Sequence, residues 1–239
     1  MISKVKSQYW RTTHKFGIRV PKSVEEAHRL DKESGTDFWA KAIQKEMSRI
    51  REAMKLYDGT LDEVRTKLVG YQMIRCHMIF DVKMEGLTRK ARFVAGGHMT
   101  ETPESLTYAS VVTRESVRLA FLTAALNDLN ILVAGVGNAY LNADCREKIF
   151  FVAGPEFGEL RGRVLIIKKA LYGLKSSRAA WRALFCSTLT KLGFQATAGD
   201  PNVWIKPAIK PDGMEYYEML LVYVDNILHV SHHKDASQN

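Results

Sequence analysis

The sequence predicts an α+β protein, and three observations support that class. Stretches with apolar residues at helical spacing alternate irregularly with short runs rich in β-branched and aromatic residues. Turn residues separate several of these runs into hairpins, so the order is not the repeating strand–helix–strand of a parallel sheet. With 239 residues, 46% of them hydrophobic and 26% charged, the chain can bury a sizeable core in one or two domains.

Three longer helices are predicted from apolar spacing. The first covers about residues 37–54, with Asp37 as its N-cap, and the second covers 114–127. The third covers 174–192, and Gly193 is expected to end it. Residues 1–36 are predicted to be an extension or linker that contains a short helix around 24–32.

The strands are predicted from apolar runs and the turns between them. Residues 71–82 and 89–95 form a hairpin around a Glu-Gly turn, and 131–136 is a short buried strand. Further strands are expected at 149–152, 164–168, 203–206 and 216–224, the last of which runs into an acidic turn at Asp225. These strands predict a compact sheet with helices on one face, followed by a polar tail over 231–239.

Composition narrows the class of protein further. Thirty-five Lys and Arg against 26 Asp and Glu give a net charge of +9, which suits a polyanion such as nucleic acid and equally serves solubility. The three cysteines are far apart and lack CxxC spacing, which argues against a disulfide framework or a structural zinc site. No apolar run approaches a spanning helix and no signal peptide is visible, so we expect an intracellular protein with no membrane partner.

Five blocks between about residues 37 and 230 resemble the reverse transcriptase domain of copia-type retrotransposons. Each block alone is a weak signal, but all five occur in the same order and at appropriate spacing. The blocks are Phe38-Trp39-Ala40 through Lys45-Glu46-Met47, Lys90–Gly97, Asn138-Ala139-Tyr140-Leu141-Asn142, Leu171–Ser177 with Ala180-Trp181, and Tyr223-Val224-Asp225-Asn226.

This resemblance implies a fold and a division of the chain. It implies a palm, which is a ferredoxin-like antiparallel sheet with helices on one face, and fingers, with the thumb absent. The fingers would cover about 37–128 and 142–172, and the palm about 129–141 and 173–230. Integrase and RNase H regions of the polyprotein are expected to be missing from this chain.

The resemblance also implies roles for individual residues. Asp225 matches a metal-binding aspartate, and Tyr140 matches the aromatic residue that selects deoxynucleotides. Lys90 and Arg92 lie where basic side chains would bind the incoming triphosphate. The remaining block, represented by Gly173 and Lys175, resembles the segment that packs over the nascent base pair. For each residue a purely structural role stays open: a hairpin aspartate, a core tyrosine, a solvated strand face or a strand-to-helix turn.

Two expected aspartates are missing. The family has Asp where this chain has Gly135, and a second Asp where it has Asn226. Two-cation nucleotidyl transfer uses carboxylates at adjacent strand ends to bind Mg²⁺. The nearest acids, Asp128 and Asp144, would lie about 20–30 Å from position 135 along an extended strand. One carboxylate of an expected three remains.

The sequence therefore predicts a reverse transcriptase (RNA-directed DNA polymerase) domain fragment that is catalytically impaired. The resemblance implies an RNA or DNA template-primer and deoxynucleoside triphosphates as partners. It implies Mg²⁺ as the cofactor, and we expect the binding of Mg²⁺ to be weakened in this chain. The alternative is a non-catalytic nucleic-acid-binding remnant of a transposable element, favoured by the positive charge. A third reading is a decayed copy that forms no stable domain.

Overall fold

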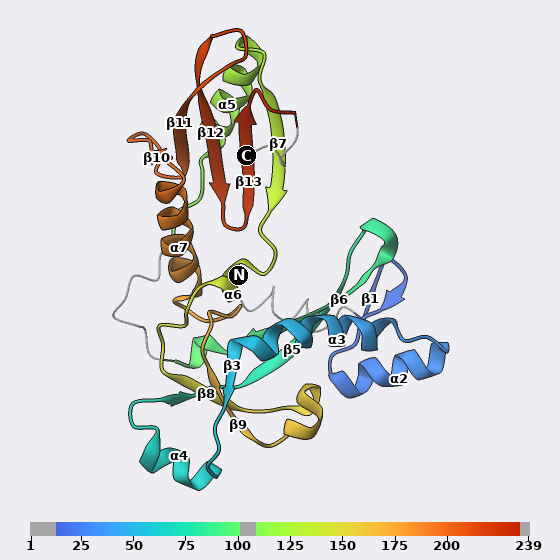
Figure 1. The fold of residues 1–239 in the computed structure, drawn as a ribbon. Coiled ribbons are helices and arrows are strands. Elements are labelled where there is room, and N and C mark those ends of the chain that lie inside the picture. Colours follow the sequence, from blue (N-terminus) through green and yellow to red (C-terminus); the bar gives the residue numbers. More distant parts are fainter. Residues whose placement is uncertain (1–12, 101–108, 235–239) are drawn as a thin grey trace. The chain divides into compact units, whose positions relative to one another are not determined.

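The computed structural model describes residues 13–100 and 109–234. Contacts divide the chain into two compact units, one of residues 1–104 and 144–177, the other of residues 105–143 and 178–239 (Figure 1). Parts of the predicted extension and tail, residues 1–12 and 235–239, lie outside the described residues. Among the residues that are described, no helix combines the length and apolar character that crossing a membrane demands.

The first unit begins with a small hairpin and two packed helices. The hairpin joins β1 (His14–Lys15) to β2 (Ile18–Arg19), and α2 (Val24–Ser34) then packs against α3 (Phe38–Ile50). Part of the predicted extension is thus ordered on this unit. The helix predicted for 37–54 is confirmed and ends earlier than expected.

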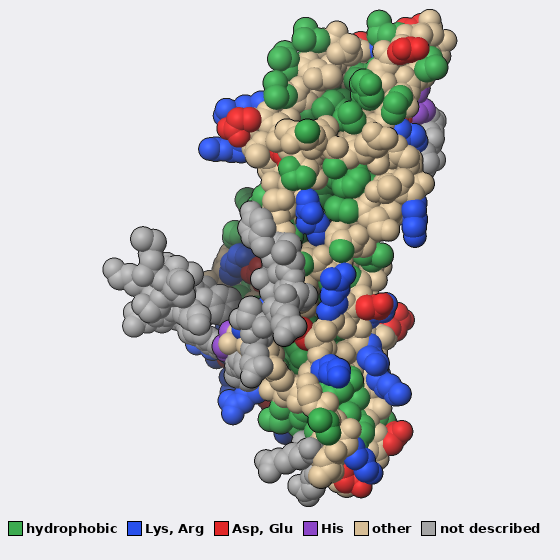
Figure 2. Space-filling view, turned by 90° about the vertical axis from the view of Figure 1, so that its left-hand side faces the viewer, with side chains coloured by type: hydrophobic (Ala, Val, Ile, Leu, Met, Phe, Trp, Pro, Cys, Tyr) green, Lys and Arg blue, Asp and Glu red, His purple; other side chains and the backbone are tan. Residues whose placement is uncertain are grey.

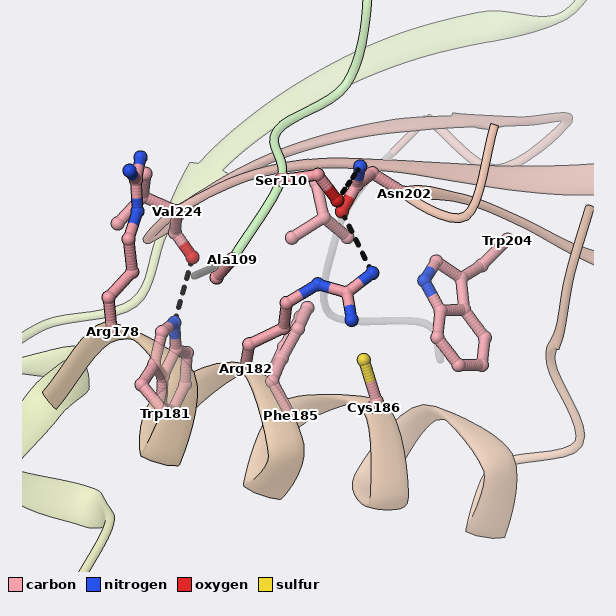
Figure 3. A pocket seen from close by; sticks show the side chains of 11 residues that line it. Ala109, Ser110, Arg178, Trp181, Arg182, Phe185, Cys186, Asn202, Trp204 and Val224 are labelled. Atoms are coloured by element: carbon pink, nitrogen blue, oxygen red, sulfur yellow. Dashed lines mark hydrogen bonds between the residues drawn. The ribbon is translucent and has the colours of Figure 1, made fainter. Parts of the chain in front are cut away.

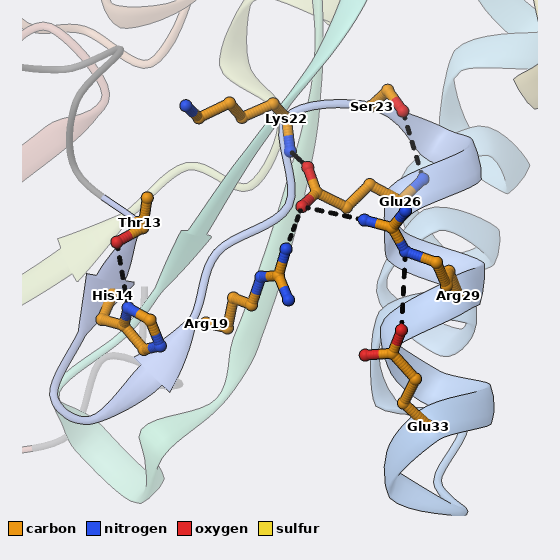
Figure 4. Close-up of polar contacts among 8 residues, drawn as sticks. All are labelled: Thr13, His14, Arg19, Lys22, Ser23, Glu26, Arg29 and Glu33. Atoms are coloured by element: carbon orange, nitrogen blue, oxygen red, sulfur yellow. Dashed lines mark hydrogen bonds and ion pairs between the residues drawn. The ribbon is translucent and has the colours of Figure 1, made fainter.

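Side-chain hydrogen bonds set the start of α2. Ser23 caps α2, and the Glu26 carboxylate accepts hydrogen bonds from the Lys22 N–H at 2.9 Å and the Arg19 guanidinium at 3.1 Å (Figure 4). The backbone hydrogen bond from Lys22 is the main cause that lowers the pKa of Glu26. These contacts fix the entry of the chain into α2.

Asp37 occupies the N-cap position of α3, but its side chain makes no capping hydrogen bond to the helix backbone. Its carboxylate pairs with Lys41 at 2.9 Å instead. Asp31 of α2, only 5% exposed, accepts hydrogen bonds from the Trp39 N–H at 3.1 Å and the Ala40 N–H at 2.8 Å. A buried side chain from the preceding helix therefore supplies the cap that the sequence assigned to Asp37.

Two sheets complete the first unit. The predicted hairpin is confirmed as β5 (Cys76–Val82) and β6 (Arg89–Ala95), and α3 lies on it. A four-stranded sheet has the order β3-β9-β8-β4, with α4 (Leu61–Lys67) beside it. Its strands are β3 Met54–Leu56, β9 Val164–Ile167, β8 Ile149–Val152 and β4 Gln72–Met73. Short 3-10 turns occupy Arg51–Ala53, Glu85–Leu87, Gly97–Met99 and Pro155–Leu160.

The second unit is built on a five-stranded antiparallel sheet with the order β10-β11-β12-β13-β7. Its strands are β10 Gln195–Ala196, β11 Val203–Ile209, β12 Glu215–Tyr223, β13 Asn226–Ser231 and β7 Asn130–Gly135. Its helices are α5 Arg114–Leu126, α6 Ala139–Asn142 and α7 Ser177–Lys191, whose first residue belongs to the first unit. The sequence analysis missed β13.

The α+β class is confirmed, but the expectation that the helices share one face of the sheet is wrong. Leu221 of β12 packs with Ala120 and Ala124 of α5, whereas Val222 packs with Leu189 of α7. Neighbouring residues of a strand point to opposite faces, so the two helices cover opposite sides of the sheet. The uninterrupted apolar run at the end of β12 is the sequence signal for burial on both faces.

The observed division places α5 in the same unit as the five-stranded sheet. The predicted boundary near residue 128 would have separated them. Naming the first unit fingers and the second palm stays a prediction.

Candidate functional site

The two degenerate motifs meet at one end of the second unit's sheet. Asn226, the first residue of β13, pairs directly with Gly135, the last residue of β7. The Val136 N–H donates to the Asp225 carbonyl at 2.7 Å, which extends the ladder past the strand end. Positions 135 and 225, which are 90 residues apart in sequence, are therefore neighbours, as the resemblance implied.

The turn that carries Asp225 is a tight hairpin fixed by a tryptophan. Val224 and Asp225 connect β12 to β13, and Val224 has a φ of +59°, which a β-branched residue rarely adopts. The Trp181 indole N–H of α7 donates to the Val224 carbonyl at 2.8 Å (Figure 3). The sequence analysis named Trp181 only as part of a resemblance block, although a buried indole N–H needs a partner and could have signalled this bond.

A buried aspartate anchors the start of α5. Asp200, which is buried, accepts hydrogen bonds from the Thr113 N–H at 2.9 Å and the Ser116 hydroxyl at 2.8 Å. Burial alone would raise the pKa of Asp200, and the hydrogen bonds outweigh that effect and lower it. Asn202 bonds Ser110 at 3.0 Å in the same region (Figure 3). The sequence analysis did not single out any of these residues.

Gly135 has room for a side chain. A Cβ built at this position would lie 3.4 Å from the Asn226 side-chain oxygen and 4.0 Å from the Asp225 carbonyl, both ordinary contacts. Its φ lies outside the left-handed region, so neither sterics nor backbone conformation requires a glycine here. An aspartate at position 135 would place its carboxylate beside the turn.

The donor set at this sheet end does not fit a two-cation site. Of the motif residues, Asp225 contributes one carboxylate, Asn226 a neutral amide and Gly135 no side chain. In the described part of the chain, no three His, Cys, Asp or Glu side chains come together as a metal site. Asp144, one of the nearest acids in sequence, belongs to the first unit and pairs with Lys169 at 2.7 Å. Mg²⁺ favours more carboxylate oxygens than this end of the sheet offers.

Tyr140 lies in the single-turn helix α6 of the second unit and is half-buried. Asn138 precedes α6 with a φ of +52°, which turns the chain sharply after β7. Tyr140 lies five residues after Gly135, the last residue of β7, and beyond this sharp turn. A contact with a nucleotide sugar stays a prediction.

Lys90 and Arg92 occupy alternate positions of β6 in the first unit and so point to the same face. Burial lowers the pKa of Lys90, and the neighbouring charges of Arg92 and Lys83 lower it further. The Arg92 guanidinium lies 4.1 Å from the centre of the Tyr172 ring. The two predicted triphosphate ligands are thus close together, and Arg92 is stacked on an aromatic ring.

Gly173 and Lys175 make close contacts within their own unit. Gly173 has a φ of +96°, and a Cβ there would lie 2.0 Å from the Ala95 carbonyl. The Lys175 ammonium donates to the Thr100 carbonyl at 2.5 Å. These contacts favour the strand-to-helix turn that the sequence analysis left open. A role over a base pair stays a prediction.

The cysteine thiols are poor nucleophiles. Burial raises the pKa of Cys76 and Cys186, and it raises that of Cys145 to about 11. At neutral pH these thiols stay protonated, and the thiolate is the reactive form. All three are free.

Sequence comparison identifies the class of protein. Residues 64–238 match the family described as reverse transcriptase (RNA-dependent DNA polymerase). The match covers both motifs at the sheet end, just over half of the first unit and nearly all of the second. The chain belongs to this family.

The relatives identify the type of element. The chain is 30% identical over 203 residues, 81% of its length, to the retrovirus-related Pol polyprotein from transposon TNT 1-94 of Nicotiana tabacum. It is 29% identical over 177 residues, 73% of its length, to the transposon Ty1-BL Gag-Pol polyprotein of Saccharomyces cerevisiae. It spans 14% and 10% of the lengths of these relatives. The chain is a reverse transcriptase domain of the copia type, corresponding to part of a retrotransposon polyprotein.

Proposed function

We propose that this domain descends from an RNA-directed DNA polymerase and has lost most of its catalytic power. The observation that carries the proposal is the Gly135–Asn226 pair, where the resemblance places two aspartates beside Asp225. Positions 135, 225 and 226 are neighbours at the sheet end, as expected, but only Asp225 has a carboxylate. Mg²⁺ would bind weakly at Asp225.

The expected loss is large. Removing carboxylates from a two-cation site costs several kcal/mol of metal binding and transition-state stabilisation. Each 1.4 kcal/mol or so of lost stabilisation slows the reaction about tenfold. Two missing ligands therefore predict a rate lower by several orders of magnitude.

The substrate-binding residues survive better than the metal ligands. We assign Lys90 and Arg92 to the triphosphate of a deoxynucleotide and Tyr140 to its sugar. The template-primer would be RNA or DNA, as the family implies. Since Lys90 and Arg92 are adjacent on one strand face, they can bind one anionic group together.

Primer extension on an RNA template with Mg²⁺ tests the proposal. The native chain should be silent, and the Gly135→Asp, Asn226→Asp variant should extend the primer. The space around Gly135 makes this variant compatible with the fold. The control is Gly137→Asp, Asn226→Asp, which has the same charge but moves one carboxylate away from the strand end. Gly137 also has no atom near an added Cβ, so the control should fold equally well.

The outcomes separate the possible causes. Activity in the native chain would overturn the proposal, because some other group would then supply the missing charge. Activity in the control as well as the revertant would show that general charge, not the position of the ligand, matters. Silence from all three chains, each shown to be folded by cooperative unfolding, would show that the metal ligands are not the limiting defect.

A further inference from the structure

An apolar groove runs along the second unit beside the Asp225 turn. Its volume is about 410 Å³, and both α5 and the sheet contribute to its walls. Most of the exposed lining surface is apolar, and Tyr223 and Asn226, which flank the turn, are among the lining residues. The apolar wall consists of Val112, Val117, Val133, Leu221, Ile227 and Leu228.

The groove is part of a well-packed region. Leu221, at 1% exposure, belongs to the hydrophobic core between α5 and the sheet, and the partly buried Val117 and Leu228 pack against that core. Val133 lies at the open side and is 75% exposed. The floor is therefore fixed by the core, while the open side leaves room for a small molecule of drug-like size.

Two arginines give the groove a charge preference. Arg114 and Arg118 line it from positions one helical turn apart on α5, and both are exposed. Neither forms a salt bridge with any residue that the structure describes. The N-terminus of α5 is already occupied by Asp200, so the two guanidinium groups would be the recognition element. An anion placed between them relieves their mutual repulsion and accepts charge-assisted hydrogen bonds.

From this combination we infer that the groove binds small amphipathic organic anions, with an aromatic or aliphatic body on the apolar floor and a carboxylate or sulfonate at the two arginines. A hydrophilic anion such as free phosphate would leave the apolar floor uncovered. A neutral apolar molecule would leave the arginines unpaired. The groove lining includes none of the substrate-binding residues proposed above, and it includes Tyr223 and Asn226, which flank the turn.

Two fluorescent probes with the same aromatic body test the inference. The anionic probe is 8-anilinonaphthalene-1-sulfonate, and N-phenyl-1-naphthylamine is its uncharged counterpart. Titration of the full chain should give one saturable site for the anionic probe. The Arg114→Gln, Arg118→Gln variant should bind the anionic probe about tenfold or more weakly, since hydrogen bonds to charged groups are lost. Its affinity for the neutral probe should stay unchanged.

Matched controls separate the groove from general effects. Arg51→Gln, Arg146→Gln removes two exposed arginines of the first unit and should leave both affinities unchanged. Val133→Trp should fill the groove and weaken both probes. Val69→Trp, at a valine with a similar exposure of 77%, should weaken neither. Thermal unfolding of each variant verifies that all are compared as folded proteins.

The inference is overturned if the anionic probe binds the two arginine double variants equally well. It is also overturned if Val133→Trp is folded and binds both probes with unchanged affinity. Binding of the anionic probe to the native chain that does not saturate would overturn it too. If Val133→Trp fails to fold, the arginine variants alone decide, because their side chains are exposed and make no contact that folding requires.

Discussion

At the residue scale, the fold requires glycine at position 173 but not at position 135. Gly173 has a left-handed backbone and meets the Ala95 carbonyl so closely that no Cβ fits. Gly135 has an unstrained backbone and open space beside Asn226. The first is required by the fold. The second is not, so its identity bears on function rather than on stability.

This contrast predicts that Gly173→Ala destabilises the protein by about 3 kcal/mol or more, because a left-handed conformation and a backbone clash add. The free energy of unfolding in urea measures it. Gly199→Ala is the control, since an added Cβ there has no neighbour within 4 Å and no left-handed φ, and it should change stability little. Equal stability of the two variants would contradict the close contact at Gly173.

At the element scale, side chains from one element determine where another begins or turns. Asp31 of α2 caps α3, Asp200 anchors α5, and Trp181 of α7 fixes the carbonyl of Val224. The bonds from Asp200 and Trp181 join residues that are far apart in sequence, whereas Asp31 and Trp39 are only eight residues apart. The Asp225 turn is therefore positioned by α7 as well as by its own strands.

The shifted pKa of His229 in β13 predicts that the stability of the second unit depends on pH. Burial lowers its pKa, Glu218 opposes that effect, and His233 and Lys206 lower the pKa further. A folded-state pKa below the unfolded value of about 6.5 means that the folded state favours neutral histidine. The stability that neutral His229 contributes is fully present above the pKa of the unfolded state, and it is lost as the pH falls through the lower pKa of the folded state.

Urea unfolding at about pH 7.5 and about pH 5 checks this prediction. The native chain should lose stability between the two, and His229→Gln should lose less. His98→Gln, at an exposed histidine of the first unit, should behave like the native chain. An equal loss in the native chain and the His229 variant would assign the pH dependence to other groups.

At the scale of the whole molecule, the chain carries a net charge of +9. On the face drawn in Figure 2, Lys and Arg side chains are spread in separate groups with acidic side chains between them. Such a distribution is compatible with contacts along a nucleic-acid backbone, which needs several separate cations. The alternative in which binding has outlasted catalysis rests on the net charge of +9.

That alternative predicts that the chain binds an RNA–DNA template-primer in a manner that depends strongly on salt and not on Mg²⁺. About six phosphate contacts would reduce the affinity roughly 10³-fold between about 50 and 200 mM salt. Lys90→Gln should lower the slope of log affinity against log salt by about one, if Lys90 contacts a phosphate. Fluorescence anisotropy with Mg²⁺ or with a chelator measures both effects.

Affinity that is insensitive to salt would contradict this prediction. Binding that requires Mg²⁺ would instead point to a metal site more complete than Asp225 alone. A chain without a cooperative unfolding transition would favour the reading of a decayed copy that forms no stable domain.

The sequence by itself determined the family, the α+β class and most of the elements, because these depend on local apolar spacing and ordered motifs. The hairpin of β5 and β6 and the helices α3, α5 and α7 follow patterns contained within each segment. The missing aspartates were also visible, since the motif alignment needs no coordinates.

Only the tertiary structure decided which distant groups meet. It paired Gly135 with Asn226, placed α5 and α7 on opposite faces, gave the α3 cap to Asp31 and formed the groove beside Arg114 and Arg118. The physical reason is that packing and hydrogen bonding join residues far apart in the chain, whereas periodicity reports only on neighbours. The same spacing of apolar residues marks a buried face without naming the element that buries it.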